Sequence, residues 1–222
     1  LHHLDLYKLS MHWEGGQGER VPAWATRVVQ DETTKIFSAQ VWSPEKPYIF
    51  KKKKFIPHTS PLLIYECHIG MAQENERIGS YDEFREKVLP RIIADGYNAI
   101  QIMAIQEHPY YGSFGYHVSS FFAPSSRFGT PDELKHLIDE AHRNGIAVIM
   151  DIVHSHAVKN EIEGLGRFDG TPNQFFYGDH RRERLGTRSV STTGKTKSSI
   201  SCSPTVNIGS KNSVSTDSVS TE

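Results

Sequence analysis

Two patterns of hydrophobic positions follow one another along this chain, and the second is the more regular. The second pattern begins at about residue 60 and contains three short apolar runs, at 62–65, 97–105 and 146–150. These runs have the length and continuous hydrophobicity of strands buried on both faces. Amphipathic segments separate these runs and predict helices over 80–96 and 130–145. Strands and helices that alternate in this way form right-handed βα units, so the sequence predicts an α/β fold with parallel strands.

Both predicted helices carry start signals. Ser80 and Glu83 have the spacing of a capping box, in which each side chain bonds the other residue's backbone amide. The run at 130–133 places an N-cap threonine before a proline in the first helical position, with acidic residues after it. Pro90 lies inside the first helix and is expected to kink it, because proline lacks the amide hydrogen that the helix needs there.

The first pattern covers residues 1–59, where aromatic and apolar residues recur between turn-forming glycines and prolines. This pattern is typical of a β-rich module and fits the end of a sandwich rather than a whole domain. The lysine run at 51–54 has no interleaved aromatic residues, so it favours a solvated edge over a phosphate-binding patch.

The third apolar run ends in an acidic residue, which gives the strongest indication of a site. Asp151 directly follows the strand, and His154 and His156 come within five residues of it. A strand buried on both faces has no use for charge, and α/β sheets place their sites at the carboxyl ends of the strands. We therefore expect a site at this strand tip.

The segment at 106–129 is long for a connection between βα units, and such loops usually build binding sites. Aromatic rings beside polar groups suit the faces and hydroxyls of sugars. For two of the aromatic residues, Phe121 and Phe122, we expect packing within the protein instead. This segment holds Tyr110, Tyr111, Phe114, Tyr116, Phe121 and Phe122.

Composition narrows the classes of function. The chain of 222 residues has a formal net charge of −1, which gives no electrostatic case for a nucleic-acid partner. The two cysteines, Cys67 and Cys202, indicate neither a disulfide framework nor a four-thiolate zinc site. No apolar run approaches the ~18 residues of a membrane span, and no secretory signal is evident. The expectation is a cytoplasmic protein without a membrane partner; because Leu1 is not a methionine, the chain is also expected to be a fragment at its start.

Three segments resemble a known family. They read AWATRVVQ (Ala23–Gln30), IYECHIGM (Ile64–Met71) and EHPYYGSFGYHVSSFFAPSSRFGTPDELKHLIDEAHRNGIAVIMDIVHSHA (Glu107–Ala157). These segments resemble the α-amylase superfamily of (β/α)8 barrels (glycoside hydrolase family 13), and specifically its 1,4-α-glucan (glycogen or starch) branching enzymes. The resemblance runs from about Ala23 to about His180.

The resemblance implies a domain order: the end of a carbohydrate-binding β-sandwich at 1–59, about three strands of the catalytic TIM barrel at 60–180, and a tail at 181–222. It implies cleavage of an α-1,4-glucan, such as glycogen or amylose, and transfer of the chain to a 6-hydroxyl. Such retaining transfer uses two carboxylates about 5–5.5 Å apart, and requires no cofactor and no metal.

Three residues carry over as substrate-binding. His156 would hydrogen-bond the glucose at the cleavage point, Asp151 would orient neighbouring groups, and Tyr116 would line the same subsite. The nucleophile and the acid/base belong after later strands, so no catalytic residue is assigned. Asp169 lies in a segment like the nucleophile motif, but only 18 residues after Asp151, too few for a βα unit. Asp169 is therefore not expected to be the nucleophile.

The tail differs in composition from everything before it. About half of 187–222 is serine or threonine, and no aromatic residue follows Tyr177. Such a segment buries too little apolar area to offset its ordering entropy, so we expect disorder, and a sequence not native to the family. With open sheet edges and no nucleophile, the chain alone is expected to be poorly soluble and inactive.

Three alternatives stay open at this stage. A hydrolase of the same superfamily would differ only in using water as the acceptor. A non-catalytic glycan-binding remnant would use the aromatic N-terminal region. A metal centre could use His154 and His156, but it would need further ligands.

Overall fold

The computed structural model of the protein describes residues 1–57, 61–172, 174–176 and 188–190. The chain divides into two compact units, each formed by segments distant in sequence. The described part of unit 1 comprises 1–44, 106–126, 153–172, 174–176 and 188–190, and that of unit 2 comprises 45–57, 61–105 and 127–152.

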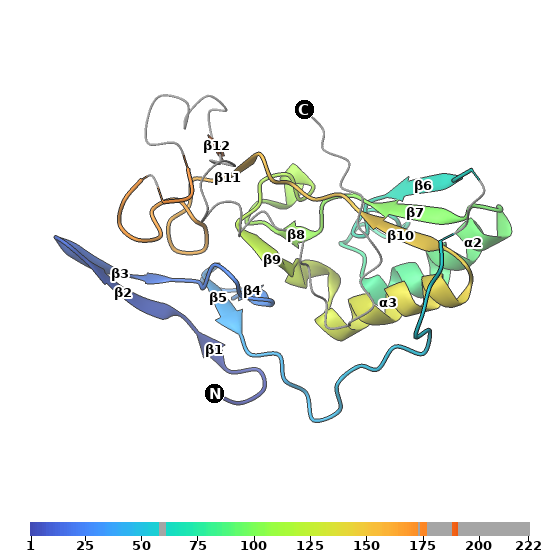
Figure 1. The fold of residues 1–222 in the computed structure, drawn as a ribbon, viewed down its shortest axis with the longest axis horizontal. Helices are drawn as coiled ribbons and strands as arrows, with labels where there is room; N and C mark the ends of the chain where they lie inside the picture. The colour runs from blue at the N-terminus through green and yellow to red at the C-terminus, as the bar shows by residue number, and fades with distance from the viewer. Residues whose placement is uncertain (58–60, 173, 177–187, 191–222) are drawn as a thin grey trace. The chain divides into compact units, whose positions relative to one another are not determined.

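Unit 2 contains the predicted βα units (Figure 1). Its parallel sheet has the order β10-β7-β6, with β6 at Ile64–Cys67, β7 at Ala99–Ile102 and β10 at Ala147–Met150. The helices are α1 (Tyr81–Glu83), the π-helix η1 (Phe84–Val88), α2 (Leu89–Ala94) and α3 (Pro131–Arg143). The predicted α/β arrangement of parallel strands is confirmed, and Figure 1 shows the helices on one side of the sheet.

The first predicted helix is interrupted as its proline requires. Instead of one α-helix, the structure has a π-helical segment that ends at Val88, directly before the α-helical turn with Pro90 near its start. Proline cannot donate to the preceding turn and its ring crowds the carbonyl four residues back. The wider π-helical turn accommodates both effects.

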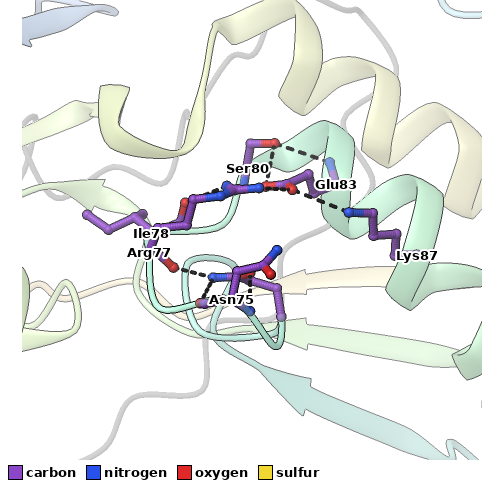
Figure 2. Close-up of polar contacts among 7 residues, drawn as sticks. Asn75, Arg77, Ile78, Ser80, Glu83 and Lys87 are labelled. Carbon is purple, nitrogen blue, oxygen red and sulfur yellow. Dashed lines mark hydrogen bonds and ion pairs between the residues drawn. The ribbon is translucent and has the colours of Figure 1, made fainter.

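The capping boxes form at both helix starts. The side chain of Ser80 accepts from the amide of Glu83, and the Glu83 carboxylate accepts from the amide of Ser80. Figure 2 shows that Arg77 also contacts this carboxylate, and Lys87 pairs with it at 3.5 Å. The Arg77 guanidinium is the main reason that the pKa of Glu83 is lowered to about 2, with the Ser80 amide contributing. Thr130 caps α3 in the same way.

A buried carboxylate on α3 holds the segment at 45–57 to the helix. Asp139, 1% exposed, accepts hydrogen bonds of 2.8 Å from the Tyr48 hydroxyl and from the amides of Lys51 and Lys52. Burial alone would raise the pKa of Asp139, but the two amides and the Tyr48 hydroxyl outweigh it and lower the pKa. Burial and the bond to Asp139 raise the pKa of Tyr48. The lysine side chains at 51–54 are exposed.

Unit 1 consists of short antiparallel sheets. Strands β1 (Leu6–Tyr7), β5 (Phe37–Gln40) and β4 (Val28–Gln30) form one sheet, in the order β1-β5-β4. The other pairs are β2 (Leu9–Trp13) with β3 (Gly16–Arg20), β8 (Gln106–Glu107) with β9 (Ser120–Pro124), and β11 (His156–Val158) with β12 (Arg188–Val190). Two 3₁₀ turns, η2 (Tyr111–Ser113) and η3 (Ser126–Phe128), complete the described elements.

The core of unit 1 joins the N-terminal region to the long aromatic loop. Val28, Phe37 and Ala39 of the three-stranded sheet pack with Ala123 of β9, and all four are buried. Apolar contacts group 1–44 with the loop, while hydrogen bonds to Asp139 group 45–57 with α3.

The hairpin of β2 and β3 is hydrogen-bonded to the loop that follows β11. Arg20, 4% exposed, donates to the carbonyl of Arg167 through Nε at 3.3 Å and through Nη2 at 2.9 Å. Its guanidinium also lies 5.0 Å from the centre of the Trp13 ring. Gly170, with φ of +81°, lies so close that a Cβ there would be 2.5 Å from that indole.

The tail prediction for 181–222 falls mostly on residues 181–187 and 191–222, which lie outside the described residues. Within the tail, Arg188–Val190 forms β12 and pairs with β11, so these three residues differ from the expected disorder. In the described ranges, no helix is long and apolar enough to cross a membrane.

Candidate functional site

The three parallel strands of unit 2 end level with one another. Cys67 and Met150 both pair with Ile102, the last residue of β7. Asp151 continues from this edge, and its amide donates to the carbonyl of Ile102 at 2.9 Å. The structure thus places Asp151 at the carboxyl edge of the sheet, where the sequence predicted it. Burial raises the pKa of the Cys67 thiol, at the end of β6, to about 12, which makes it a poor nucleophile.

In unit 1, two of the predicted site residues meet. His156, 8% exposed, opens β11, and its Nε2 lies 2.8 Å from the carbonyl oxygen of Tyr116. A carbonyl only accepts, so Nε2 carries the proton in this contact. Nδ1 is then the acceptor for the Ser155 hydroxyl, 2.8 Å away. The imidazole is thereby fixed in one tautomer and one orientation.

His154 belongs to the same segment but has a different environment. Burial lowers its pKa, so the ring is neutral near neutral pH. As for the metal alternative, the described residues contain no group of three or more His, Cys, Asp or Glu side chains arranged to hold an ion.

A buried carboxylate fixes the long loop that carries Tyr116. Glu107, 0% exposed, accepts from the Ser125 hydroxyl at 3.0 Å, from the Ser126 amide at 2.8 Å and from the Ser126 hydroxyl at 3.0 Å. Its neighbour Gln106 donates to the carbonyl of Phe121 and accepts from the amide of Val153 at 2.9 Å. The bonds of Glu107 join the two ends of the loop, and the bond between Gln106 and Val153 joins the start of the loop to the segment that leads to β11.

Neither the role of Gln106 nor that of Glu107 was predicted from the sequence. The only signal was an amide and a carboxylate directly after a long apolar run. Both residues are structural, because their polar groups bond the backbone and hydroxyls of the loop. Of the two phenylalanines expected to pack, Phe121 is 7% exposed and Phe122 is half-buried.

A tight turn carries the remaining aromatic residues. Ser113 donates to the Tyr110 carbonyl through both its amide, at 3.0 Å, and its hydroxyl, at 2.7 Å. Phe114 has φ of 52°, in the left-handed region, and its amide donates to the carbonyl of Tyr111. The Tyr116 amide then donates to the Ser113 carbonyl at 3.0 Å. The turn thus ends at the residue that holds His156.

Asp169 lies in the loop after β11 and not at the end of a buried strand. Its carboxylate accepts from the amide of Thr171 at 3.0 Å and from the Thr171 hydroxyl at 2.7 Å, as in an Asx turn. That Asp169 is not the nucleophile stays a prediction.

These features match a known family. The model of the alpha-amylase catalytic domain matches residues 87–204, more than half of the chain, and the chain therefore belongs to the alpha-amylase family. Within this family it is similar to 1,4-alpha-glucan-branching enzymes. That of Eremothecium gossypii is 52% identical over 172 residues, covering 74% of this chain and 24% of the relative. A chloroplastic/amyloplastic branching enzyme of Arabidopsis thaliana is 48% identical over 186 residues, covering 81% and 22%.

Solved structures show the same fold. The catalytic module of the glycogen-degrading pneumococcal virulence factor SpuA superposes with a TM-score of 0.67 at 18% identity, over 85% of this chain and 32% of the module. A streptococcal pullulanase, solved in complex with maltotetraose, has a TM-score of 0.69 at 17% identity, over 88% of this chain and 30% of its own.

The match covers only part of the relatives and ends at a defined residue of this chain. The chain spans about a quarter of the length of the branching enzymes that it matches. The family match continues to residue 204, beyond the expected end of the resemblance near His180.

Proposed function

We propose that this chain forms the first glucan-contacting part of a 1,4-α-glucan branching enzyme. The single observation that carries the proposal is the contact between His156 and Tyr116, at the two positions that resemble the family's glucose-binding residues. The identity of about 50% to branching enzymes over most of the chain supports this reading. The substrate would be an α-1,4-glucan such as glycogen or amylose.

His156 would bind the sugar through a nitrogen that changes partners. Nε2–H stays on the Tyr116 carbonyl and keeps the ring in place. Nδ1 is an acceptor held by the Ser155 hydroxyl, so a glucose hydroxyl could replace Ser155 there without turning the ring. The exchange of one hydroxyl donor for another costs little net hydrogen bonding. Tyr116 would present its ring to the same sugar.

Asp151 would orient neighbouring active-site groups, as the resemblance implies. The three parallel strands of unit 2 would be the first three strands of the barrel, and the antiparallel strands at 1–44 the end of a carbohydrate-binding β-sandwich. The tail beyond residue 180 would not contribute to the site, although the family model matches the sequence as far as residue 204.

Tyr116→Ala tests the binding site, because it removes the ring but keeps the carbonyl that holds His156. His12→Ala is a matched control, since it removes an exposed ring from the same unit. Calorimetric titration with maltotriose should show weaker binding for Tyr116→Ala and His156→Ala and no change for His12→Ala. Equal affinity in all variants would contradict the proposed site.

We further propose that the chain alone does not catalyse transfer, because none of its carboxylates is assigned as nucleophile or acid/base. Incubation of the chain with amylose should produce no α-1,6 branches, measured as chains released by a debranching enzyme. New branches would refute this part of the proposal, and new reducing ends without branches would favour the hydrolase alternative.

A further inference from the structure

A buried side chain connects the two backbone segments that carry the proposed glucose contacts. Gln106 opens β8 and is 5% exposed. Its Nε2 donates to the carbonyl of Phe121 at 3.0 Å, and its Oε1 accepts from the amide of Val153 at 2.9 Å. Both partner residues are buried as well, so these two bonds form away from the competition of water.

The partners of Gln106 belong to the segments that contain the site residues. One segment runs from Tyr116 to Phe121, and the other runs from Val153 to His156. The two segments meet at one end through the contact of 2.8 Å between His156 Nε2 and the Tyr116 carbonyl oxygen. The Gln106 side chain joins them at the other end, so the segments and their two links form a closed ring.

His156 lies between two anchored positions of its own segment. After it, the amide of Val158 donates to the carbonyl of Val118 at 3.0 Å, a backbone bond that no side-chain substitution removes. Before it, Val153 is held by the side chain of Gln106. Loss of the Gln106 link would therefore leave β11 in place and free the stretch that leads into His156.

The position requires one donor and one acceptor at defined places. The Phe121 carbonyl only accepts and the Val153 amide only donates, so the side-chain amide of Gln106 has one orientation that satisfies both. A buried carbonyl and a buried amide left without these partners are unfavourable, and the segments would shift to satisfy them elsewhere. Because hydrogen bonds weaken steeply with distance and angle, a small shift of the His156 ring would weaken its bond to a sugar hydroxyl.

We infer that Gln106 is a positioning residue of the glucose site, which sets the placement of His156 relative to Tyr116. This inference rests on the proposed function of those two residues. Gln106 is buried and acts through them, not through its own contact with the sugar. Its bonds therefore determine the affinity of each folded molecule, in addition to the stability of the loop.

The test compares Gln106→Met with Gln40→Met by isothermal titration calorimetry with maltotriose. Methionine has a similar length but makes neither hydrogen bond. Gln40 is a matched bridge in the same unit, because it donates to the Leu4 carbonyl at 3.2 Å and accepts from Arg27 at 2.7 Å, away from the site residues in sequence.

The two variants should differ in the dissociation constant and not only in the folded fraction. Gln106→Met should raise the Kd about tenfold, while Gln40→Met should leave it unchanged. Unfolded molecules lower the fitted stoichiometry and leave the Kd of the folded ones as it was. A merely structural role of Gln106 would therefore reduce the stoichiometry alone.

Gln106→Glu adds a pH profile as a second readout. An ionised carboxylate repels the Phe121 carbonyl, whereas a protonated one donates to it and still accepts from Val153. Burial favours the protonated form, so the loss of affinity relative to the unmodified chain should be larger at about pH 8.5 than at about pH 5.5. Both proteins share the titratable groups that are near this position in sequence or by hydrogen bond, which are Glu107, His108, His154 and His156.

Four results would overturn the inference. They are an unchanged Kd for Gln106→Met, a loss of its stoichiometry alone, an equal rise in Kd for Gln40→Met, and a Gln106→Glu deficit that keeps its full size at about pH 5.5. Failure of the unmodified chain to bind maltotriose would instead overturn the proposed function. In that case the ¹⁵N signals of the His156 imidazole still test the positioning: Gln106→Met should mix the two tautomers and Gln40→Met should not, and an unchanged tautomer in Gln106→Met would overturn it.

Discussion

The substitution Asp139→Asn tests whether one buried carboxylate holds residues 45–57 to helix α3. Asp139 is 1% exposed and accepts three hydrogen bonds, each of 2.8 Å. Asparagine has nearly the same shape, so the change removes charge and acceptor capacity without leaving a cavity. Its amide nitrogen must face at least one of the three donors.

The arrangement of donors determines the expected cost. Oδ2 accepts from Tyr48 and Lys51, and Oδ1 accepts only from Lys52. The best rotamer puts the amide nitrogen at the Oδ1 position, so the Lys52 bond is lost and the other two become neutral hydrogen bonds. A bond to a charged group contributes about 1.5–3 kcal/mol, and a neutral one about 1 kcal/mol. We therefore expect a loss of about 3 kcal/mol in the free energy of unfolding.

Far-ultraviolet circular dichroism in urea is the appropriate assay, because in the described ranges the α-helices all belong to unit 2. Glu140→Gln is the matched control: it removes a charge from the same helix, but from a partly exposed pair with Arg143 that contributes at most about 1 kcal/mol. An equal effect of the two substitutions would refute the role assigned to Asp139.

The dependence on pH gives an independent check. The folded pKa of Asp139 is lowered, so its contribution is fully present above the unfolded pKa of about 3.8 and is lost as the pH falls through the folded pKa. The difference between the original chain and Asp139→Asn should therefore be constant from about pH 7 to about pH 5 and shrink below about pH 4. A difference that persists undiminished at low pH would show that the charge is not responsible.

Three further substitutions have defined outcomes. Gly170→Ala adds a methyl group 2.5 Å from the Trp13 indole at a φ of +81°, and should lower the free energy of unfolding by about 2–4 kcal/mol. The urea midpoint followed by tryptophan fluorescence measures this loss, and an unchanged midpoint would mean that the hairpin does not pack against this loop. Thr130→Ala removes the N-cap of α3 and should cost about 1 kcal/mol by circular dichroism, with Thr130→Ser as a neutral control. Glu83→Gln should remove the part of the stability that is present above about pH 4.5 and lost as the pH falls to about 2, since Arg77 lowers the folded pKa of Glu83; an unaltered acid titration would contradict this assignment.

The elements of unit 2 could be predicted from the sequence because local signals specify them. Apolar runs and capping boxes need only neighbouring residues, and β6, β10 and α3 begin within two residues of the predicted positions. The run at 97–105 was predicted too long, since β7 ends at Ile102. Ala104 and Ile105 beyond it are buried without pairing in the parallel sheet, so the apolar run continues past the end of the strand.

The support of the candidate site could not be predicted, because its contacts join distant positions. Gln106 accepts from the amide of Val153, 47 residues away, and Glu107 accepts from a serine 19 residues away. No periodicity or local motif encodes such pairs. The resemblance named Tyr116 and His156, but that the backbone of one holds the ring of the other required coordinates.

The level ends of β6, β7 and β10 restrict how the length of this chain can change. Successive residues of a strand point to opposite faces of a sheet, so deletion of one residue from β10 would exchange the faces on which Met150 and Asp151 lie. Deletion of two residues would restore the faces but withdraw Asp151 from the sheet edge by about 6.6 Å. Insertions and deletions compatible with a carboxylate at this edge are therefore confined to the connections, and the strand itself can vary in sequence but not in length.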